Sequence, residues 1–283
     1  MRDVSVVIPV YNRCDLLRKT LLSLANQSHP PREIIITDDG SSEDVRAALE
    51  ASLSGLPGSV GYVVQPRNGF RAARCRNNGI RYARSDIIIL WDQDIIATRG
   101  YVAAYACAIG PRRFVTGYPV RLTEAQTAEL SDGLIGGGRF EGFVTGRQRS
   151  KIARQFAKDL LAYHARKWHL SRLCRPKLRS GVSGVWREDL LLVDGFDENY
   201  EGWGNEDDDL GRRLYALGAR GRNVCLGEYP LHLHHAPHHR GGFRRNRDYA
   251  RIRARRIGAG DVRAVRGLSS RSPEEHHGLT WLK

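Results

Sequence analysis

The chain has 283 residues, of which 41% are hydrophobic and 27% are charged, so it can fill a folded core and is not an intrinsically disordered protein. Its 45 Lys and Arg outnumber its 31 Asp and Glu and give a formal net charge of +14. A surplus of this size predicts an anionic partner such as phosphate, nucleic acid or an acidic membrane surface.

The cysteines and the first residues indicate a cytosolic protein. The five cysteines are scattered and form no CxxC pair, which is typical of reduced thiols rather than of a disulfide framework or a zinc site. No run of about 18 apolar residues is present, so we expect no transmembrane helix. The first residues, MRDVSVVIPVYNR, lack the layout of a signal peptide and are predicted to form a strand.

Three short apolar segments in the first third predict a buried parallel sheet. They cover residues 4–10, 33–37 and 86–91 and are apolar on both faces, as in strands that are covered on two sides. Helices are expected between them, since strands that alternate with helices build an open, doubly wound α/β sheet.

The expected helices follow leucine spacing and capping signals. The first covers residues 15–27, the second covers 43–53 with Ser41 or Ser42 as its N-cap, and the third covers about 71–83. In such sheets the ligand lies beyond the carboxyl ends of the strands. The polar strand ends are therefore the candidate ligand-binding segments: Pro9-Val10-Tyr11-Asn12, Asp38-Asp39-Gly40-Ser41 and Asp92-Gln93-Asp94.

The rest of the chain divides by composition. Residues 131–146 are glycine-rich and are interpreted as a loop, and residues 147–175 are predicted to form a basic helix. Residues 240–256 hold eight arginines against one acid, Asp248. This tail either docks on an anionic membrane or forms a helix that folds back on the domain, and the sequence does not choose between the two.

Two acidic clusters are candidates for chemistry. Asp92 and Asp94 follow a buried strand, where they either hold a divalent cation that binds diphosphate oxygens or are solvated turn residues. Residues 206–209 (EDDD) either cap the helix that follows or supply a general base. Trp203, between two glycines, would offer a flat apolar face to a sugar ring.

Histidines and arginines add two further candidates. Five histidines fall within residues 232–239, so at least one is expected to bind a metal. Strand alternation would place His232 and His234 on one face and His235 on the other. Four arginines at positions 67, 71, 74 and 76 could meet nucleotide phosphates, although a solvated helix face would explain some of them.

These segments together resemble a known family. VSVVIPVYNR, TDDGSS and the D-x-D after a strand are similar to the nucleotide-binding half of family-2 glycosyltransferases of the GT-A fold. GWGNEDDD (202–209) is similar to a stretch of β-1,4-galactosyltransferases and of bacterial chondroitin-type polymerases, and Phe70-Arg71-Ala72 is similar to a donor-binding stretch of the former. The resemblance implies one GT-A domain over residues 1–240, with a nucleotide-sugar half (1–100) and an acceptor half (101–240), followed by a basic extension (241–283).

The resemblance also implies a role for each matching residue. Pro9, Tyr11 and Asp39 would contact the uridine, Arg71 the base or phosphates, and Asp92 the ribose.

On the metal and acceptor side, Asp94 would bind Mn²⁺ or Mg²⁺ together with His235, with His232 as the second choice. Trp203 and Glu206 would hold the acceptor sugar, and Asp207 would be the catalytic base. Asp208 and Asp209, which directly precede Leu210, could then serve as helix caps.

The implied activity is that of an inverting, metal-dependent hexosyltransferase that acts by single displacement. It would move a sugar from a UDP-hexose or UDP-N-acetylhexosamine to a glycan or lipid-linked acceptor, in the cytoplasm or on the inner face of the membrane.

Other functions fit the sequence less well. A basic nucleic-acid-binding protein leaves the acidic clusters unexplained, and a His-rich metal-binding protein explains only residues 232–239. A nucleotidyltransferase or a dinucleotide oxidoreductase would need a Gly-rich loop where residues 9–12 stand. Donor sugar, acceptor and linkage stay open.

Overall fold

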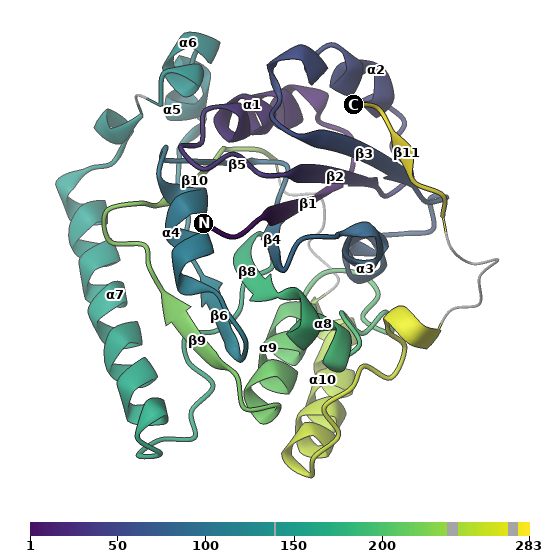
Figure 1. Cartoon of the computed structure of the whole chain (residues 1–283), viewed down its shortest axis with the longest axis vertical. Coiled ribbons are helices and arrows are strands. Elements are labelled where there is room, and N and C mark those ends of the chain that lie inside the picture. Colours follow the sequence, from purple (N-terminus) through teal and green to yellow (C-terminus); the bar gives the residue numbers. More distant parts are fainter. Residues whose placement is uncertain (139, 237–242, 271–276) are drawn as a thin grey trace.

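The computed structural model describes residues 1–138, 140–236, 243–270 and 277–283. An eight-stranded sheet in the order β11-β3-β2-β1-β4-β8-β6-β9 forms its centre (Figure 1). The strands are β1 (Val4–Val10), β2 (Glu33–Asp38), β3 (Ser59–Val64), β4 (Ile87–Trp91), β6 (Arg113–Thr116), β8 (Val182–Trp186), β9 (Arg220–Asn223) and β11 (Thr280–Trp281). β3, β2, β1 and β4 run parallel, while β8 is antiparallel to both β4 and β6.

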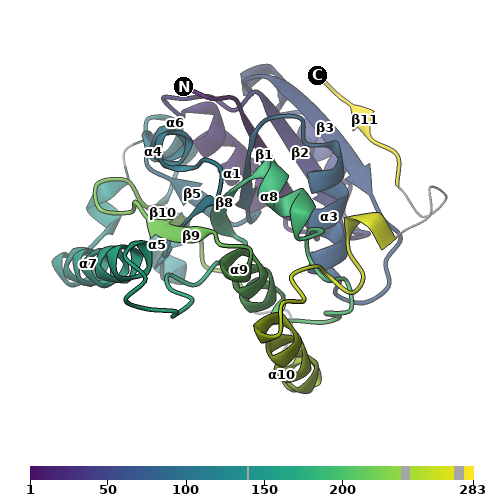
Figure 2. The ribbon, with the colours of Figure 1, turned by 60° about the horizontal axis from the view of Figure 1, so that its bottom comes forward.

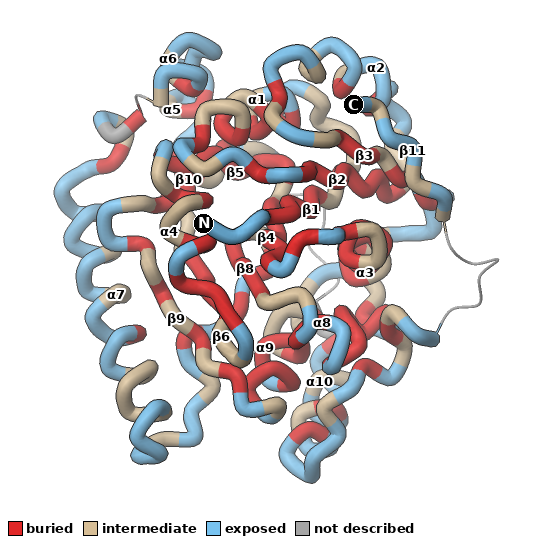
Figure 3. Tube along the Cα trace, viewed as in Figure 1, coloured by how far each residue is buried: buried red, intermediate tan, exposed pale blue. Residues whose placement is uncertain are grey.

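The predicted open, mostly parallel α/β sheet is thus confirmed. β1, β2 and β4 are almost completely buried, as their two apolar faces require (Figure 3). Alternate residues of β1 serve opposite layers: Val6 and Ile8 pack with α1 (Cys14–Ala25), whereas Val7 packs with α3 (Ala72–Tyr82). The views in Figures 1 and 2 show these two helices on opposite faces of the sheet.

The second helix differs from its prediction. α2 spans only Val45–Glu50, and its N-cap is Asp44, whose side chain accepts the N–H of Ala47 at 2.9 Å. The expectation that Ser41 or Ser42 caps this helix is therefore wrong. The Ser41 hydroxyl accepts the N–H of Asn12 and donates to Asp38, so it joins the ends of β1 and β2 instead.

A second, three-stranded sheet lies beside the end of β4. It consists of β5 (Ile95–Ala97), β10 (Pro230–His232) and β7 (Val120–Arg121), in which β10 is the middle strand. β10 runs antiparallel to β5 with His232 opposite Ile95, and the N–H of Leu233 donates to the carbonyl oxygen of Asp94 at 2.9 Å. This pairing brings the histidine segment to the D-x-D across more than 130 residues of chain.

Helices from the second half cover the remaining surfaces. The predicted basic helix is α7 (Gly146–Lys167), which begins one residue early and ends eight residues before position 175. The glycine-rich segment is not a plain loop, because it contains α6 (Asp132–Gly136) and η2 (Glu141–Phe143). The other elements are η1 (Leu53–Gly55), α4 (Tyr101–Ala108), α5 (Glu124–Glu129), α8 (Arg187–Leu192), α9 (Glu206–Ala216) and η3 (Leu268–Ser270).

The arginine-rich tail forms α10 (Phe243–Gly258), which lies beside α9 in both views (Figures 1 and 2). Asn246, Arg253 and Ile257 are buried on its inner face, whereas Arg251 and Ile252 are exposed. Of the two alternatives, a helix that folds back on the domain is the one observed. None of the helices in the described ranges has the length and apolar character that crossing a membrane requires.

Candidate active site

A cavity of about 740 Å³ opens at the carboxyl ends of β1, β2 and β4, where the strand ends are polar. Its wall contains most of the residues singled out from the sequence: Pro9, Tyr11, Asp39, Asp92, Asp94, Trp203, His232 and His235. Arg71, Glu206 and Asp207 lie outside this wall, and Arg71 instead forms an ion pair with Glu201 at 3.2 Å. The structure therefore gathers the two halves of the predicted site around one space.

The first part of the wall is formed around the Tyr11 ring and the Asp39 carboxylate. The guanidinium of Arg67 lies 3.8 Å from the centre of the Tyr11 ring and donates to Asp39 at 2.8 Å. Asp39 also accepts from Gln65 and from the N–H of Arg71, while its burial raises its pKa. Such a wall offers an aromatic face and fixed hydrogen-bonding groups to a planar base.

The second part holds a buried cation, Arg76 of α3. Its guanidinium donates to Asp92 at 2.9 Å and lies 3.6 Å from a carboxylate oxygen of Glu206. Its side chain is only 7% exposed, so these carboxylates balance its charge away from water. The sequence named Arg76 only as one of four arginines, because nothing local distinguishes it; its role arises where α3 meets the start of α9.

The third part is a cluster with the donor set of a metal site. The Nε2 atoms of His235 and His232 lie 2.7 and 3.8 Å from Oδ2 of Asp94. One ligand atom from each residue can be chosen so that all three lie within 4.8 Å of one another. Oδ1 of Asp94 is buried and has no hydrogen-bond partner among the described residues. These residues therefore fit a divalent cation.

Strand alternation was misleading at this point. It predicted that His232 and His235 lie on opposite faces, but β10 ends at His232 and the chain turns, so both rings face Asp94. Burial by itself would raise the pKa of Asp94, yet the hydrogen bond from His235 and the nearby charges of His232 and Arg13 lower it overall. The same hydrogen bond raises the pKa of His235.

The four consecutive acids at the start of α9 have four different environments. Glu206 is buried beside Arg76, Asp207 accepts the N–H of Ser180 at 3.1 Å, and Asp208 pairs with Lys177 at the surface. Asp209 is buried against Arg213 at 2.6 Å. The N-cap is Asn205, without a side-chain cap, so the expectation that Asp208 and Asp209 cap the helix is wrong.

Of these four acids, Glu206 and Asp207 each have a buried carboxylate oxygen that could accept a further hydrogen bond. Burial, followed by the charge of Asp207, raises the pKa of Glu206 to about 7. One carboxylate oxygen of each is buried without a hydrogen-bond partner among the described residues. Trp203 is 55% exposed in the cavity wall, on a turn in which Gly202 and Gly204 have φ values of 80° and 99°.

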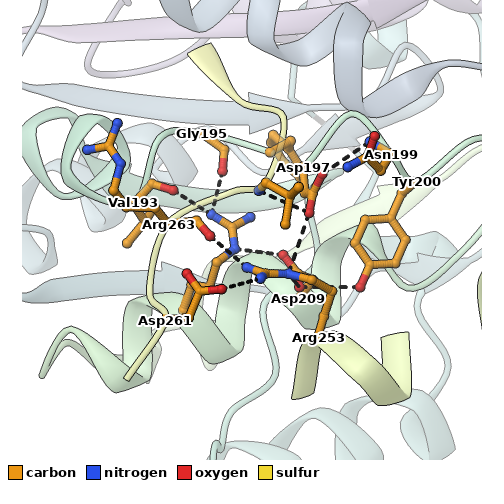
Figure 4. A network of polar contacts seen from close by, with 12 residues as sticks. Val193, Gly195, Asp197, Asn199, Tyr200, Asp209, Arg253, Asp261 and Arg263 are labelled. Carbon is orange, nitrogen blue, oxygen red and sulfur yellow. Dashed lines mark hydrogen bonds and ion pairs between the residues drawn. The ribbon is translucent and has the colours of Figure 1, made fainter. Parts of the chain in front are cut away.

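Asp209 belongs to a network behind the site (Figure 4). Arg253 of α10 lies 3.5 Å from both Asp209 and Asp197 and 2.8 Å from Asp261. Next to this network, the Asn246 side chain donates to the carbonyl oxygen of Gly204 at 2.9 Å. The sequence contained no signal for these contacts, which tie α10 to the tryptophan turn and to α9.

Comparisons with known proteins agree with this arrangement. Residues 5–108 match the family described as Glycosyl transferase family 2, and residues 162–236 match the family described as the N-terminal domain of galactosyltransferase. The expected resemblance to these two groups of glycosyltransferases is confirmed.

Among curated relatives, the validoxylamine A glucosyltransferase of Streptomyces hygroscopicus subsp. limoneus is 32% identical over 76% of this chain and 48% of its own length. The hyaluronan synthase of Pasteurella multocida is 29% identical over 76% of this chain and 23% of its own length. The Escherichia coli chondroitin synthase is 29% identical over 78% of this chain and 33% of its own length. The chain thus spans less than half the length of each of these relatives.

Two solved structures show the same fold. The mannosyltransferase PcManGT from Pyrobaculum calidifontis, in complex with GDP-Man and Mn²⁺, has a TM-score of 0.56 at 18% identity and covers 89% of this chain and 62% of its own. S. aureus TarS 1-349 in complex with UDP-GlcNAc has a TM-score of 0.56 at 14% identity and covers 84% of this chain and 60% of its own. The chain therefore has a GT-A type α/β fold.

Proposed function

We propose, on the premise that residues 5–108 match family 2 glycosyltransferases, that the chain is an inverting, metal-dependent glycosyltransferase. It would move a hexosyl or N-acetylhexosaminyl unit from a UDP-sugar to a hydroxyl group of a glycan or lipid-linked acceptor. One observation carries this proposal: the Asp94–His232–His235 cluster and Trp203 line the same cavity as Arg76, whose guanidinium lies 3.6 Å from a carboxylate oxygen of Glu206.

The donor nucleotide would occupy the wall formed by the strand ends. Pro9, Tyr11 and Asp39 would hold the uracil and its ribose from one side, and Asp92 would accept a hydrogen bond from a ribose hydroxyl. The backbone N–H of Arg71 donates to Asp39 from outside the cavity wall. The Arg71 side chain would reach the donor only after its ion pair with Glu201 is broken.

Asp94, His235 and His232 would hold the metal ion. A mixed oxygen and nitrogen donor set favours Mn²⁺ over Mg²⁺, because imidazole suits the softer ion. When bound, such an ion would stabilise the negative charge of the departing nucleoside diphosphate.

The acceptor sugar would lie against Trp203, and Glu206 would bind one of its hydroxyl groups. Asp207 would take the proton of the attacking hydroxyl group while the oxygen forms a bond to the anomeric carbon and the bond to the diphosphate breaks. Attack from the face opposite the leaving group inverts the anomeric centre. Arg76 forms ion pairs with Asp92 and Glu206, and the negative charge of Asp207 also attracts its guanidinium.

A donor screen that measures the released nucleoside diphosphate tests the activity. We expect release from at least one UDP-sugar in the presence of Mn²⁺; if no nucleotide sugar is consumed or bound, the proposal fails.

Metal dependence is tested by calorimetry of UDP with Mn²⁺ and after treatment with EDTA. We expect Asp94→Asn and His235→Ala to weaken Mn²⁺ and UDP binding by about 10-fold or more, because each removes a ligand. His234→Ala is the matched control, since His234 is not part of the three-residue cluster. Equal UDP affinity with and without the metal would contradict the assignment.

A further inference from the structure

A second cavity, of about 730 Å³, lies between the ends of α7, α9 and α10. Figure 1 shows these helix ends along the lower edge of the molecule. Its wall contains six basic side chains: Arg166, Lys167, His169, Arg172, Arg212 and Arg220. No Asp or Glu is among the described residues that line it, and we call it the basic cavity.

Among the described residues, no carboxylate pairs with the arginines or the lysine of the basic cavity. Arg166 donates to the carbonyl oxygens of Arg172 and Tyr215 at 3.2 and 2.7 Å, and Arg220 lies 5.9 Å from the Tyr163 ring. Within the described ranges, no carboxylate forms an ion pair with any of its arginines or with Lys167, in contrast to the paired Arg76, Arg213 and Arg253 elsewhere. Cations that are gathered without carboxylates repel one another unless an anion joins them.

The same segment exposes large apolar side chains. Trp168, Leu170 and Leu173 are 61%, 77% and 66% exposed, and they alternate with the cations of the basic cavity along the chain. Leu161 of α7, 72% exposed, lies seven residues before Trp168, which is the C-cap residue of this helix. A small soluble anion would use the cations and leave these apolar groups in water.

We propose that this surface docks on a bilayer that contains acidic phospholipids. A lipid phosphate would enter the basic cavity, and Trp168, Leu170 and Leu173 would enter the interfacial region, where exposed aromatic and aliphatic groups beside Lys and Arg are stable. The charge of +14 complements such a surface.

The proposed membrane-docking surface is not the arginine-rich tail, for which docking on an anionic membrane was one of two alternatives. α10 contributes Ala254, Ile257 and Gly258 to the basic cavity, whereas its Arg253 is buried in the network of Figure 4. The basic cavity is also separate from the candidate active site. The first turn of α9 carries Glu206, its end contributes Tyr215 and Ala216 to the basic cavity, and its 11 residues span about 16 Å.

The test is co-sedimentation of the full chain with vesicles of phosphatidylcholine alone or mixed equally with phosphatidylglycerol, at low salt. We expect binding to the acidic vesicles only. Lys167→Glu combined with Arg172→Glu should weaken it by about 10-fold or more, because two exposed cations are reversed. Trp168→Ser combined with Leu170→Ser should weaken it several-fold. Arg247→Glu combined with Arg251→Glu, on the exposed face of α10, is the matched control and should bind nearly as the parent does.

Several results would overturn the proposal. One is that the parent does not sediment with acidic vesicles, and another is that the α10 control loses as much vesicle binding as the variants of the basic cavity. A third is that the chain binds soluble glycerol phosphate tightly but does not bind vesicles. Concentration-dependent self-association that the Trp168 and Leu170 changes abolish, without vesicle binding, would instead assign the surface to a second copy of the chain. Circular dichroism melting establishes that each variant folds. Vesicle binding needs no donor sugar, so its failure is distinct from failure of the proposed transferase activity.

Discussion

Asp207 and Glu206 are neighbours in the chain, yet their surroundings suit them to different tasks. Asp207 accepts one backbone N–H, from Ser180, and has a second oxygen without a partner among the described residues. Glu206 is buried beside Arg76 and holds its proton more strongly than an ordinary carboxyl group. We assign the acceptor contact to the buried Glu206 and the proton transfer to Asp207, whose second carboxylate oxygen has no partner among the described residues.

We therefore predict that Asp207→Asn lowers the turnover number by about 10² to 10⁴-fold, because it keeps the size of the side chain but removes the base. UDP affinity in the presence of Mn²⁺ should stay near that of the parent. Asp208→Asn is the control, because Asp208 pairs with Lys177 at the surface. Transfer at near the parent rate by Asp207→Asn would show that another group is the base.

A second prediction concerns the pH dependence of stability. The pKa of Glu206 is raised from 4.5 to about 7, mainly by burial, so the folded chain binds more protons than the unfolded chain between these values. The raised pKa therefore stabilises the fold below about pH 4.5, and this contribution is lost as the pH rises through 7.

The test is Glu206→Gln, which should gain stability relative to the parent by up to about 3 kcal/mol between pH 5 and pH 8. Urea unfolding at both pH values measures this difference. Glu50→Gln is the control: Glu50 forms an exposed ion pair with Arg46, so the stability difference from the parent should hardly change between pH 5 and pH 8. A Glu206→Gln difference that is the same at both pH values would contradict the raised pKa.

The sequence predicted that Asp94 and His235 come together, but not the ion pairs that Arg76 makes with Asp92 and Glu206. Asp94 and His235 were assigned because a resemblance supplied both motifs, and the pairing of β10 with β5 brings them together. Arg76 could not be singled out, because its burial depends on α9, which is 130 residues away in the chain. Long-range contacts of this kind carry no local pattern.

Among the elements, those with two apolar faces were predictable and those defined by their neighbours were not. β1, β2 and β4 have continuous apolar runs, whereas β3 is interrupted by Gly61 and Tyr62 and was not expected. The fold-back of α10 was only one of two alternatives, because its decisive contacts join Arg253 to Asp197 and Asp209 across more than 40 residues.

This contact gives a prediction for α10. Arg253→Met should lower the free energy of unfolding by about 3–5 kcal/mol, because it leaves the buried carboxylate of Asp197 without a cation, while Asp209 keeps its pair with Arg213. Arg251→Met is the control: its pair with Asp248 is exposed, so we expect a change within about 0.5 kcal/mol. Equal effects of the two changes in denaturant titrations would show that the network of Figure 4 contributes little.

At the scale of the whole molecule, the two matched regions are interwoven rather than joined end to end. β8 lies between β4 and β6 in the large sheet, and β10 pairs with β5 in the small one. Neither half can complete its sheet alone. The strands of residues 1–100 and 101–240 therefore share both sheets, and the assignment of these two parts to the donor and the acceptor stays a prediction.

The extension completes the same unit on both sides of the molecule. α10 supplies Arg253 to Asp197 and Asp209, and β11 pairs with β3 at the edge of the large sheet. The boundary at residue 240, beyond which residues 241–283 form a basic extension, stays a prediction. We expect the full chain to melt in one cooperative transition that tryptophan fluorescence and far-ultraviolet circular dichroism report at the same temperature.

We further predict that a fragment of residues 1–240 melts at a lower temperature than the full chain and at or below that of Arg253→Met. The fragment loses the same cation and, in addition, the packing of α10 and the pairing of β11, so its destabilisation should be at least as large. A fragment that melts like the full chain and still binds UDP with Mn²⁺ would show that the extension is separable. In that case the contact between Asn246 and Gly204 would not be needed to hold the tryptophan turn at the cavity.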